Sequence, residues 1–247
     1  MRFVLAGACG RMGRAVAELG GENIAAGVDF KPSEMPFPVY ASLEEITSPA
    51  DAVIDFSSAN GICERLAWCE KHGVPAVLAA TGYSEADLTC IAQTARKIAL
   101  FKTGNLSVGI ALLQYLAEKA ASFLGDGFEA EIVERHHNQK KDAPSGTALM
   151  LADSLEKGFG TAKQRVYGRQ GLTGARDRAE IGIHAVRGGN IVGEHEIMFA
   201  GEDEIITVSH SARSRKVFAT GALRAAEWLV GKPAGLYAMQ DLVDSLL

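Results

Sequence analysis

Apolar and polar positions follow one rhythm in the first part of this 247-residue chain. Up to about residue 105, short apolar runs such as RFVLAG, which begins at Arg2, are each followed by a stretch with helical spacing of its apolar residues. A short apolar run that ends in glycine is typical of a strand buried on both faces. The alternation of strands and helices predicts a parallel, doubly wound sheet.

A different rhythm begins after residue 106. It opens with a segment of helical spacing, GIALLQYLAEKAASFL. Apolar and polar residues then alternate with period two in four segments, FEAEIVERHH, AEIGIHAVRG, NIVGEHEIMFAG and DEIITVSHSA. Such alternation indicates half-buried strands of a mixed or antiparallel sheet. Helical spacing returns in KVFATGALRAAEWLVG, which we expect to pack back on the first part of the chain.

These patterns predict an α/β protein with two domains. The first, a Rossmann-like parallel-sheet domain, is expected to comprise residues 1–106 and 216–247, and the second, an α+β domain with a mixed or antiparallel sheet, residues 107–215. Two local features add detail. Ser84, with Asp87 three residues later, predicts a capping box at a helix start, and the proline-rich stretch DFKPSEMPFPVY predicts an exposed loop.

Composition narrows the class of protein. The net charge is −5 and the isoelectric point is about 5.7, which argues against a protein that coats nucleic acid. Nowhere does the chain reach the roughly 20 apolar residues that span a bilayer. The four cysteines form no Cys-x-x-Cys pair, so we expect reduced thiols in a cytoplasmic protein with no membrane or nucleic-acid partner.

A glycine-rich loop, GACGRMG, joins the first predicted strand to the first helix. Gly7, Gly10 and Gly13 are spaced G-x-x-G-x-x-G, a variant of the dinucleotide fingerprint. Glycines let the backbone approach a pyrophosphate, and the helix start supplies free N–H groups. Asp29 ends the second predicted strand about 20 residues further on, where an acid would hold the ribose hydroxyls. A tight turn without a ligand is the alternative interpretation. Phe30 follows the acid where an arginine often reads the extra phosphate of NADPH, which favours NADH or use of both cofactors.

The stretch ERHHNQKKDAPSGTA concentrates proton-handling groups in residues 134–148. On a strand, His136 and His137 point to opposite faces, and the other histidines are distant in sequence, so a metal site is disfavoured. Ser145 is a candidate helix cap, and the residues after it offer free N–H groups to an anion. A lysine near the positive end of a helix is unfavourable unless an anion binds there, which indicates a carboxylate substrate. Lys140 and His136 are then the candidate proton donors.

Together, GACGRMG and ERHHNQKKDAPSGTA resemble the dihydrodipicolinate reductase family, also called 4-hydroxy-tetrahydrodipicolinate reductase. The resemblance extends through DAVIDFSS, GNLSVG, EIGIHAVRGGNIVGEHEIMFAG and HSARSRKVFATGALRAAEWLVGK, so it covers essentially the whole chain. It implies a homotetramer that uses NADH or NADPH to reduce a cyclic imine dicarboxylate in the diaminopimelate route to lysine. It also implies that the second domain binds substrate and forms the oligomer.

The resemblance also implies roles for particular residues. His136 and Lys140 would be catalytic, as acid/base and proton donor. Substrate would contact His137, Ser145, Gly146, Thr147 and Arg215. The cofactor would contact Gly7, Ala8, Cys9, Gly10, Arg11, Met12, Asp29, Ala79, Ala80, Thr81, Thr103, Gly104, Asn105 and Leu106.

Two alternative functions are considered. Another Rossmann oxidoreductase, such as an amino-acid or sugar dehydrogenase, would share the glycine loop but not the histidine-lysine segment. A redox sensor that binds NADH without catalysis would need no proton donors, so Lys140 and His136 argue against it.

Overall fold

The computed structural model describes residues 1–80 and 82–245. The chain divides into two compact units, one formed by Met1–Val108 with Arg215–Leu247 and the other by Gly109–Ser214. Each unit has its own sheet and its own apolar core. Nucleotide binding by the first unit and substrate binding and oligomerisation by the second stay predictions at this point. In the described part of the chain, every helix is too short or too polar to cross a membrane.

The first unit is built on a parallel sheet, as the sequence predicts. Its described strands have the order β12-β6-β5-β4-β1-β2-β3, and every neighbouring pair is parallel. The strands are β1 (Phe3–Ala6), β2 (Ile24–Val28), β3 (Val39–Tyr40), β4 (Ala52–Asp55), β5 (Ala76–Leu78), β6 (Ala99–Lys102) and β12 (Gly235–Tyr237). The central strand β1 is buried along its whole length, which explains its continuous run of apolar residues.

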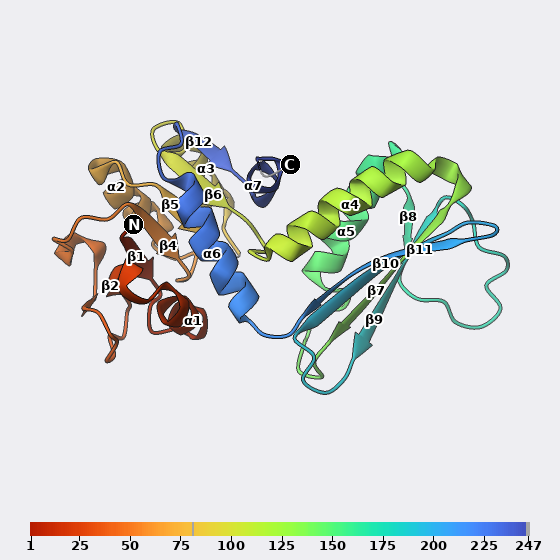
Figure 1. Cartoon of the computed structure of the whole chain (residues 1–247), viewed down its shortest axis with the longest axis horizontal. Helices are drawn as coiled ribbons and strands as arrows, with labels where there is room; N and C mark the ends of the chain where they lie inside the picture. Colours follow the sequence, from red (N-terminus) through yellow and green to blue (C-terminus); the bar gives the residue numbers. More distant parts are fainter. Residues whose placement is uncertain (81, 246–247) are drawn as a thin grey trace. The chain divides into compact units, whose positions relative to one another are not determined.

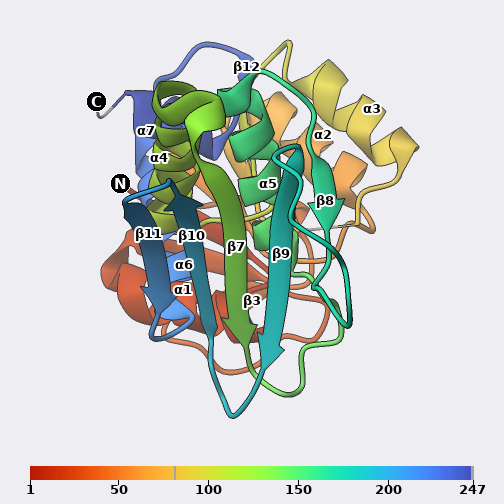
Figure 2. The same ribbon diagram turned by 90° about the vertical axis from the view of Figure 1, so that its right-hand side faces the viewer.

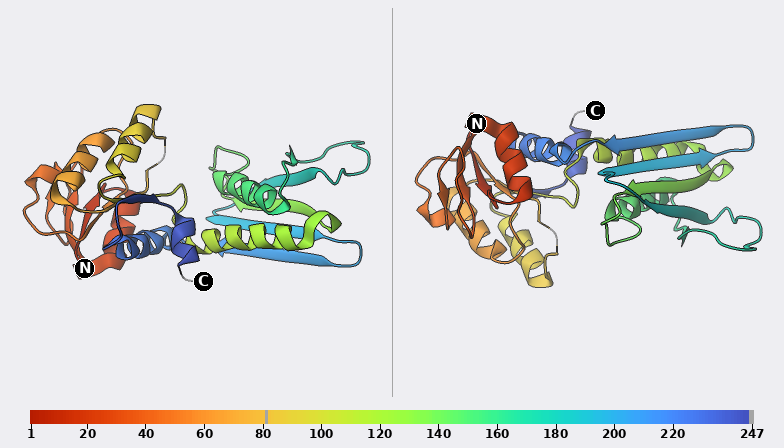
Figure 3. Two further views of the ribbon diagram at one scale, coloured as in Figure 1. Left: turned by 90° about the horizontal axis from the view of Figure 1, so that it is seen from above. Right: turned by 90° about the horizontal axis from the view of Figure 1, so that it is seen from below.

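Helices cover both faces of this sheet (Figures 1 and 3). On one face lie α1 (Arg11–Gly20) and α6 (Lys216–Leu229), which contact each other. The small residues Ala219, Ala222 and Ala226 are fully buried in α6 and let it approach β4, β5 and β6 closely. The other face is packed by α2 (Ile62–His72) and α3 (Glu85–Thr94), and the short α7 (Met239–Asp244) contacts α6. Two 3-10 turns, η1 (Gly21–Asn23) and η2 (Leu43–Glu45), complete the unit.

The two local predictions in this unit have different outcomes. The capping box is confirmed, because Ser84 Oγ accepts from Asp87 N at 3.2 Å and Asp87 Oδ2 accepts from Ser84 N at 2.9 Å. The exposed proline-rich loop is wrong in its second half. There Phe37 is buried and β3 pairs with β2, with Gly27 N donating to Pro38 O at 2.8 Å. The backbone of β2 would otherwise lack partners on that side, and edge pairing supplies them.

The second unit is a mixed sheet with its helices on one face. The described strands have the order β11-β10-β7-β9-β8, seen face-on in Figure 2 with the helices behind. The strands are β7 (Glu129–His136), β8 (Gln164–Val166), β9 (Glu180–Arg187), β10 (Gly193–Ala200) and β11 (Ile205–Ala212). β9 pairs in parallel with β7 and β8, whereas β10 pairs antiparallel with β7 and β11. The helices are α4 (Val108–Leu124) and α5 (Gly146–Phe159), with the 3-10 turn η3 (Gly125–Gly127) after α4.

Alternation along β7 decides which of its side chains face the helices. Ala130 and Ile132 pack in the core with Leu151 and Leu155 of α5. Because side chains on a strand alternate between faces, the next even-numbered residues continue on the same side. At the carboxyl end of β7, the core face of the sheet therefore carries two polar side chains, Glu134 and His136, instead of apolar ones.

Candidate active site

The glycine loop follows β1 and opens α1. Gly7 has φ +76°, and a Cβ there would lie 2.7 Å from the backbone carbonyl carbon of Phe56. A Cβ on Gly13 would collide with the carbonyl oxygens of Gly7 and Ala8. Glycine is therefore required at both positions by the close approach of the loop to β4 and of α1 to the loop.

Asp29 ties the glycine loop to the end of β2. Its Oδ2 accepts from Cys9 N at 2.9 Å, and its Oδ1 accepts from Lys31 N at 3.0 Å. Arg14 supports the same loop, since its Nε donates to Cys9 O at 3.1 Å and its guanidinium reaches Ser33 Oγ. The acid that the sequence assigns to ribose binding thus also holds the loop that precedes α1.

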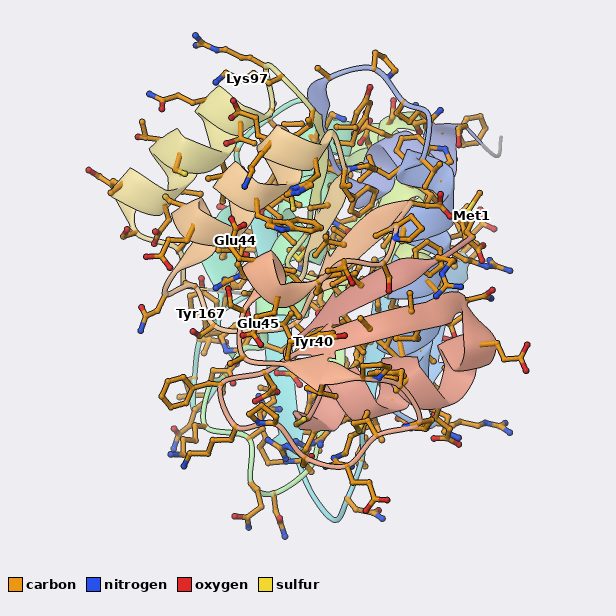
Figure 4. The ribbon with its side chains drawn as sticks, turned by 90° about the vertical axis from the view of Figure 1, so that its left-hand side faces the viewer. Met1, Tyr40, Glu44, Glu45, Lys97 and Tyr167 are labelled. Carbon is orange, nitrogen blue, oxygen red and sulfur yellow. The ribbon has the colours of Figure 1, made fainter. Side chains whose placement is uncertain are left out.

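A cavity of about 1220 Å³ opens beside this loop. Gly7, Gly10 and Asp29, from the predicted cofactor set, line it. Its wall continues through Phe30 and the segment 56–61 to α2 and η2. Glu44 at this rim and Tyr40 of the neighbouring β3 are labelled in Figure 4. A space of this size, with backbone N–H groups and an acid at one end, fits an extended nucleotide.

An ion pair between Asp55 and Arg65, which lines the cavity, is absent from the sequence predictions. Asp55, at the end of β4, accepts from Arg65 Nε at 2.7 Å and from Ser57 N at 2.9 Å. The same guanidinium donates to Ser58 O at 2.6 Å and to Asn60 O at 2.8 Å. Arg65 therefore fixes the turn that forms part of the cavity wall. An acid at a strand end with an arginine on the following helix is the signal that could have found it.

The remaining predicted cofactor residues follow β5 and β6. Thr103 Oγ1 donates to Asn105 O at 2.8 Å and accepts from Asn105 N at 3.1 Å, which closes a tight turn. Leu106 is buried, and a Cβ on Gly221 of α6 would collide with its carbonyl oxygen. Ala79 and Ala80 directly follow β5, and the predicted Thr81 lies outside the described residues.

The histidine-lysine segment of the second unit contains a buried carboxylate–imidazole pair. His136 Nδ1 lies 2.6 Å from Glu134 Oε2, and the Glu134 side chain is completely buried. Arg187 binds both oxygens of this carboxylate, each at 2.7 Å. The pairing of strands explains this meeting, because Arg187 lies opposite His136 in the parallel pair β7–β9.

The start of α5 joins the same cluster. Ser145 caps the helix as predicted, with its Oγ accepting from Ala148 N at 3.2 Å. Ser145 N donates to Glu134 Oε1 at 2.9 Å, and Ser145 Oγ lies 3.1 Å from His195 Nε2. The His195 ring also packs edge-on against His136, with ring centroids 5.2 Å apart. Glu134, Arg187 and His195 thus belong to a cluster in which the sequence analysis assigned only His136 and Ser145.

The other predicted residues surround this cluster less closely. Lys140 Nζ lies 3.0 Å from Asp142 Oδ1, and its charge is near enough to act on His136. His137 and Thr147 are partly exposed and Gly146 is exposed, so the first turn of α5 is accessible. Arg215 is the exposed N-cap of α6, which belongs to the first unit.

Burial and neighbouring charge set the protonation of these groups. Burial would raise the pKa of Glu134, but the hydrogen bonds from Arg187 and His136 outweigh it and hold that pKa below its usual range. Burial lowers the pKa of His136, and the hydrogen bond that its Nδ1 donates to Glu134 offsets this only in part. Burial and the adjacent His136 lower the pKa of His195 to about 4. Near neutral pH, Glu134 is therefore ionised and His195 is neutral.

Metal ligands do not gather around either region. Across residues 1–80 and 82–245, no three or more histidine, cysteine, aspartate or glutamate side chains are placed to hold an ion. The described cysteines are free thiols.

A doubly wound parallel sheet with a glycine loop, and a separate mixed sheet with a buried acid–imidazole pair, define a two-domain oxidoreductase of the Rossmann type. Residues 1–106 match the model of the N-terminal part of dihydrodipicolinate reductase, and residues 109–243 match that of its C-terminal part. The chain belongs to the dihydrodipicolinate reductase family. Enzymes of this family reduce 4-hydroxy-tetrahydrodipicolinate with NADH or NADPH in the lysine and diaminopimelate pathway, and their N-terminal domain binds the nucleotide.

Individual relatives agree over nearly the full length. The chain is 48% identical to 4-hydroxy-tetrahydrodipicolinate reductase of Caldanaerobacter subterraneus subsp. tengcongensis, with 98% of each chain covered. It is 41% identical to the enzyme of that name from Clostridium botulinum, again over 98% of each. A dipicolinate-bound dihydrodipicolinate reductase from Paenisporosarcina sp. TG-14 superposes with a TM-score of 0.80 at 25% identity, covering 98% of this chain and 99% of the other.

More distant structures share the fold alone. A myo-inositol dehydrogenase from Corynebacterium glutamicum gives a TM-score of 0.59 at 15% identity, with 95% of this chain and 90% of that chain covered. The family match therefore decides against the sugar- or amino-acid-dehydrogenase alternative and against a non-catalytic sensor.

Proposed function

We propose that this chain reduces 4-hydroxy-tetrahydrodipicolinate with His136 and Lys140 as its proton donors and with the start of α5 as its carboxylate site. One observation carries the proposal: an imidazole held by a buried carboxylate lies beside a capped helix start, and both are fixed by Glu134. The reaction needs these two capacities together, proton transfer and anion binding.

The cofactor side of the proposal rests on the first unit. The loop Gly7–Met12 and Asp29 border a cavity large enough for a dinucleotide, and Arg65 stiffens its far wall. Bound there, the nicotinamide would supply the hydride. Asp29 would accept from the ribose hydroxyls, and its negative charge would disfavour the 2′-phosphate of NADPH.

The substrate side rests on the second unit. The substrate carries two carboxylates, and the backbone N–H groups of Gly146 and Thr147 would hold one of them at the positive end of the α5 dipole. The relative from Paenisporosarcina binds dipicolinate, itself a ring dicarboxylate, which supports a substrate of this class. Arg215 would contribute a further charge to the second carboxylate, and His137 would contact the ring.

The chemistry of the substrate explains the need for two proton donors. Loss of the ring hydroxyl as water takes up one proton at the hydroxyl and releases one from the adjacent ring carbon, which gives a conjugated imine. Reduction at the carbon remote from nitrogen sends an electron pair toward that nitrogen, and the resulting enamine system must be protonated. Lys140 and His136 would supply these protons, while the helix start keeps the ring in one orientation.

We also propose that the protein is a cytoplasmic homotetramer that assembles through the second unit. Both helices of that unit lie on one face of its sheet (Figure 2). On the opposite face Val186 and Ile205 are 45% and 64% exposed. Burial of apolar surface of this kind drives subunit association. Sedimentation of the wild type and of Ile205→Glu tests this: a tetramer that the charge dissociates is expected, and a monomeric wild type contradicts it.

The proposed function is tested by absorbance at the reduced-nicotinamide band while 4-hydroxy-tetrahydrodipicolinate is added to enzyme and cofactor. The absorbance should fall with wild-type protein and fall far more slowly with His136→Ala. Equal rates in the two proteins would refute the assigned role of His136.

A further inference from the structure

We propose that Glu134 is a positioning residue for this reaction: clamped by Arg187, it decides which nitrogen of His136 exchanges a proton with the substrate and fixes that ring to the start of α5. The inference rests on the proposed function, because it assigns Glu134 a role through His136. Glu134 lies in the stretch that the sequence analysis singled out, but no role was predicted for it there, and the proposed function uses it only as the group that holds His136 and Ser145 in place.

The hydrogen bonds of Glu134 leave one assignment for the imidazole. Both oxygens of this carboxylate receive donors: His136 Nδ1 and Arg187 Nη1 at Oε2, Ser145 N and Arg187 Nη2 at Oε1. An ionised carboxylate has no proton to donate, so Nδ1 of His136 must carry the hydrogen of their shared bond. The nitrogen that gains and loses a proton during turnover is therefore Nε2.

Space beside Nε2 is kept open by a glycine. A Cβ on Gly193 would lie 3.1 Å from His136 Nε2 and 3.8 Å from His195 Cε1. Any larger residue at the first position of β10 would crowd the nitrogen that Glu134 leaves for exchange. Gly193 and Glu134 thus act on opposite sides of the same ring.

Arg187 makes a buried negative charge compatible with an anionic substrate. Without it, Glu134 would repel a carboxylate arriving at the start of α5, since its Oε1 is bound to the helix cap Ser145. The bidentate pair neutralises this charge while leaving its acceptors in use. Arg187 Nη2 also donates to Asp142 O at 2.7 Å, so the same guanidinium holds the segment that carries Lys140.

The opposite face of β7 provides a matched control. Glu131 has its own bidentate arginine, Arg169, at 3.0 Å for each bond, and its own histidine, His184, with Nε2 at 2.7 Å. This cluster lies on the same strand and likewise pairs an acid with a bidentate arginine and a histidine, with a second arginine, Arg176, whose Nε donates to Glu131 Oε1 at 2.8 Å. It faces away from α5 and touches none of the assigned site residues. Replacing Glu131 therefore reports what the loss of a buried acid network does by itself.

Glu134→Gln is the decisive variant. The carboxamide has one acceptor oxygen and one NH₂ group, whereas both positions in the site face donors. If the NH₂ group lies toward His136, Nδ1 must become an acceptor and the proton moves to Nε2. If it lies toward Ser145, it opposes the backbone N–H at the start of α5. Either placement removes the negative charge that raises the pKa of His136.

The experiment combines two readouts on full-length protein. Ring ¹⁵N NMR of His136 in the cofactor-free wild type should show Nδ1 protonated, and in Glu134→Gln a changed tautomer ratio with a pKa shifted to lower pH. Steady-state kinetics should show kcat reduced by roughly 10–100-fold, as for loss of a group that orients a functional histidine. The alkaline limb of the pH profile should move to lower pH, and Glu131→Gln should leave that limb in place.

The outcomes separate this proposal from the proposed function. The positioning role would be overturned if Glu134→Gln kept the kcat, the alkaline limb of the pH profile and the His136 tautomer of the wild type, even if His136→Ala is inactive. Full activity of His136→Ala would instead overturn the function assigned to His136, while the NMR readout would still decide whether Glu134 sets its tautomer. If Glu134→Gln does not fold because Arg187 is left without its partner, the double variant Glu134→Gln/Arg187→Gln removes both charges and is measured in the same way.

Discussion

The hydroxyl of Ser145 and Nε2 of His195 lie 3.1 Å apart, although the two residues are separated by 50 positions in the sequence. The contact joins the cap of α5 to β10 in the core of the second unit, where both side chains are buried. The helix start proposed to bind a carboxylate is thus fixed by side chains from two strands, by His195 from β10 and by Glu134 from β7. Such support keeps an anion site in one geometry.

Ser145→Ala should destabilise the second unit more than an ordinary cap deletion. Loss of a serine cap costs about 1 kcal/mol. Here His195 would also lose its hydroxyl partner in a buried site, which adds about 1–3 kcal/mol. Urea unfolding at pH 7.5 measures the sum. Ser84→Ala is the matched control, because it removes a cap from exposed α3 without orphaning a histidine. Equal losses in the two variants would show that the Ser145–His195 contact contributes nothing.

Acidification below pH 6.5 should destabilise the protein through the buried imidazole of His195. The pKa of His195 is about 4 in the folded state and near its ordinary 6.5 in the unfolded state. Between these values the unfolded state binds more protons, so the free energy of unfolding falls as pH falls through that window. From pH 6.5 to 5 the loss from His195 alone is about 1.6 kcal/mol. Urea titrations at several pH values measure this slope, and His195→Gln should flatten it. An unchanged slope in that variant would show that groups other than His195 cause the decrease in the free energy of unfolding.

Removal of either proton donor should slow chemistry more than binding. We expect Lys140→Ala and His136→Ala to lower kcat by ~10²–10⁴, the range for loss of a general acid. Steady-state kinetics at saturating cofactor measures the effect. Lys141→Ala, which changes the neighbouring exposed lysine, is the control and should retain wild-type kcat. Unchanged turnover in both Lys140→Ala and His136→Ala would exclude the roles proposed for them.

Arg215→Ala should act mainly on substrate affinity. Its side chain is exposed at the start of α6, and the proposal gives it a carboxylate of the substrate rather than a proton to transfer. Loss of one such ion pair should raise KM about tenfold, on the order of 1.4 kcal/mol, with a smaller effect on kcat. Arg224→Ala, an exposed arginine on the same helix, supplies the comparison. A KM equal to that of the wild type would remove Arg215 from the site.

Asp29→Asn should change the choice of cofactor. The amide keeps the size of the side chain but removes the charge that repels a 2′-phosphate, so the ratio of kcat/KM for NADPH to that for NADH should rise about tenfold. Any decrease in kcat/KM for NADH would reflect in part the weakened hydrogen bond from Cys9 N, which fixes the glycine loop. A ratio that stays constant would mean that Asp29 shapes the loop without reading the ribose.

The periodicity of the sequence was sufficient to predict the helices and strands, but it did not predict which strands pair. The buried run of β1, the caps at Ser84 and Ser145 and the alternation along β7 depend on neighbouring residues, and these expectations are confirmed. The mixed order β11-β10-β7-β9-β8 depends on contacts between distant segments. A local pattern does not contain information about such contacts, and the short edge strand β3 was not predicted for the same reason.

The site shows the same division. The sequence singled out His136 and Ser145 because each lies in a recognisable local pattern. Arg187 reaches Glu134 only because β9 pairs with β7 so that Arg187 lies opposite His136, and His195 lies opposite Glu134 in the pairing of β10 with β7. His195 was considered only as a distant metal ligand, and its contact with Ser145 follows from a register that no motif encodes.

The most direct test of the account is a crystal structure of this protein with NADH and dipicolinate bound. We predict that one carboxylate of dipicolinate accepts from the backbone N–H groups of Gly146 and Thr147, with His136 Nε2 and Lys140 Nζ directed at its ring. A dicarboxylate bound away from the start of α5, with His136 Nε2 beyond hydrogen-bond reach of it, would contradict the proposed site.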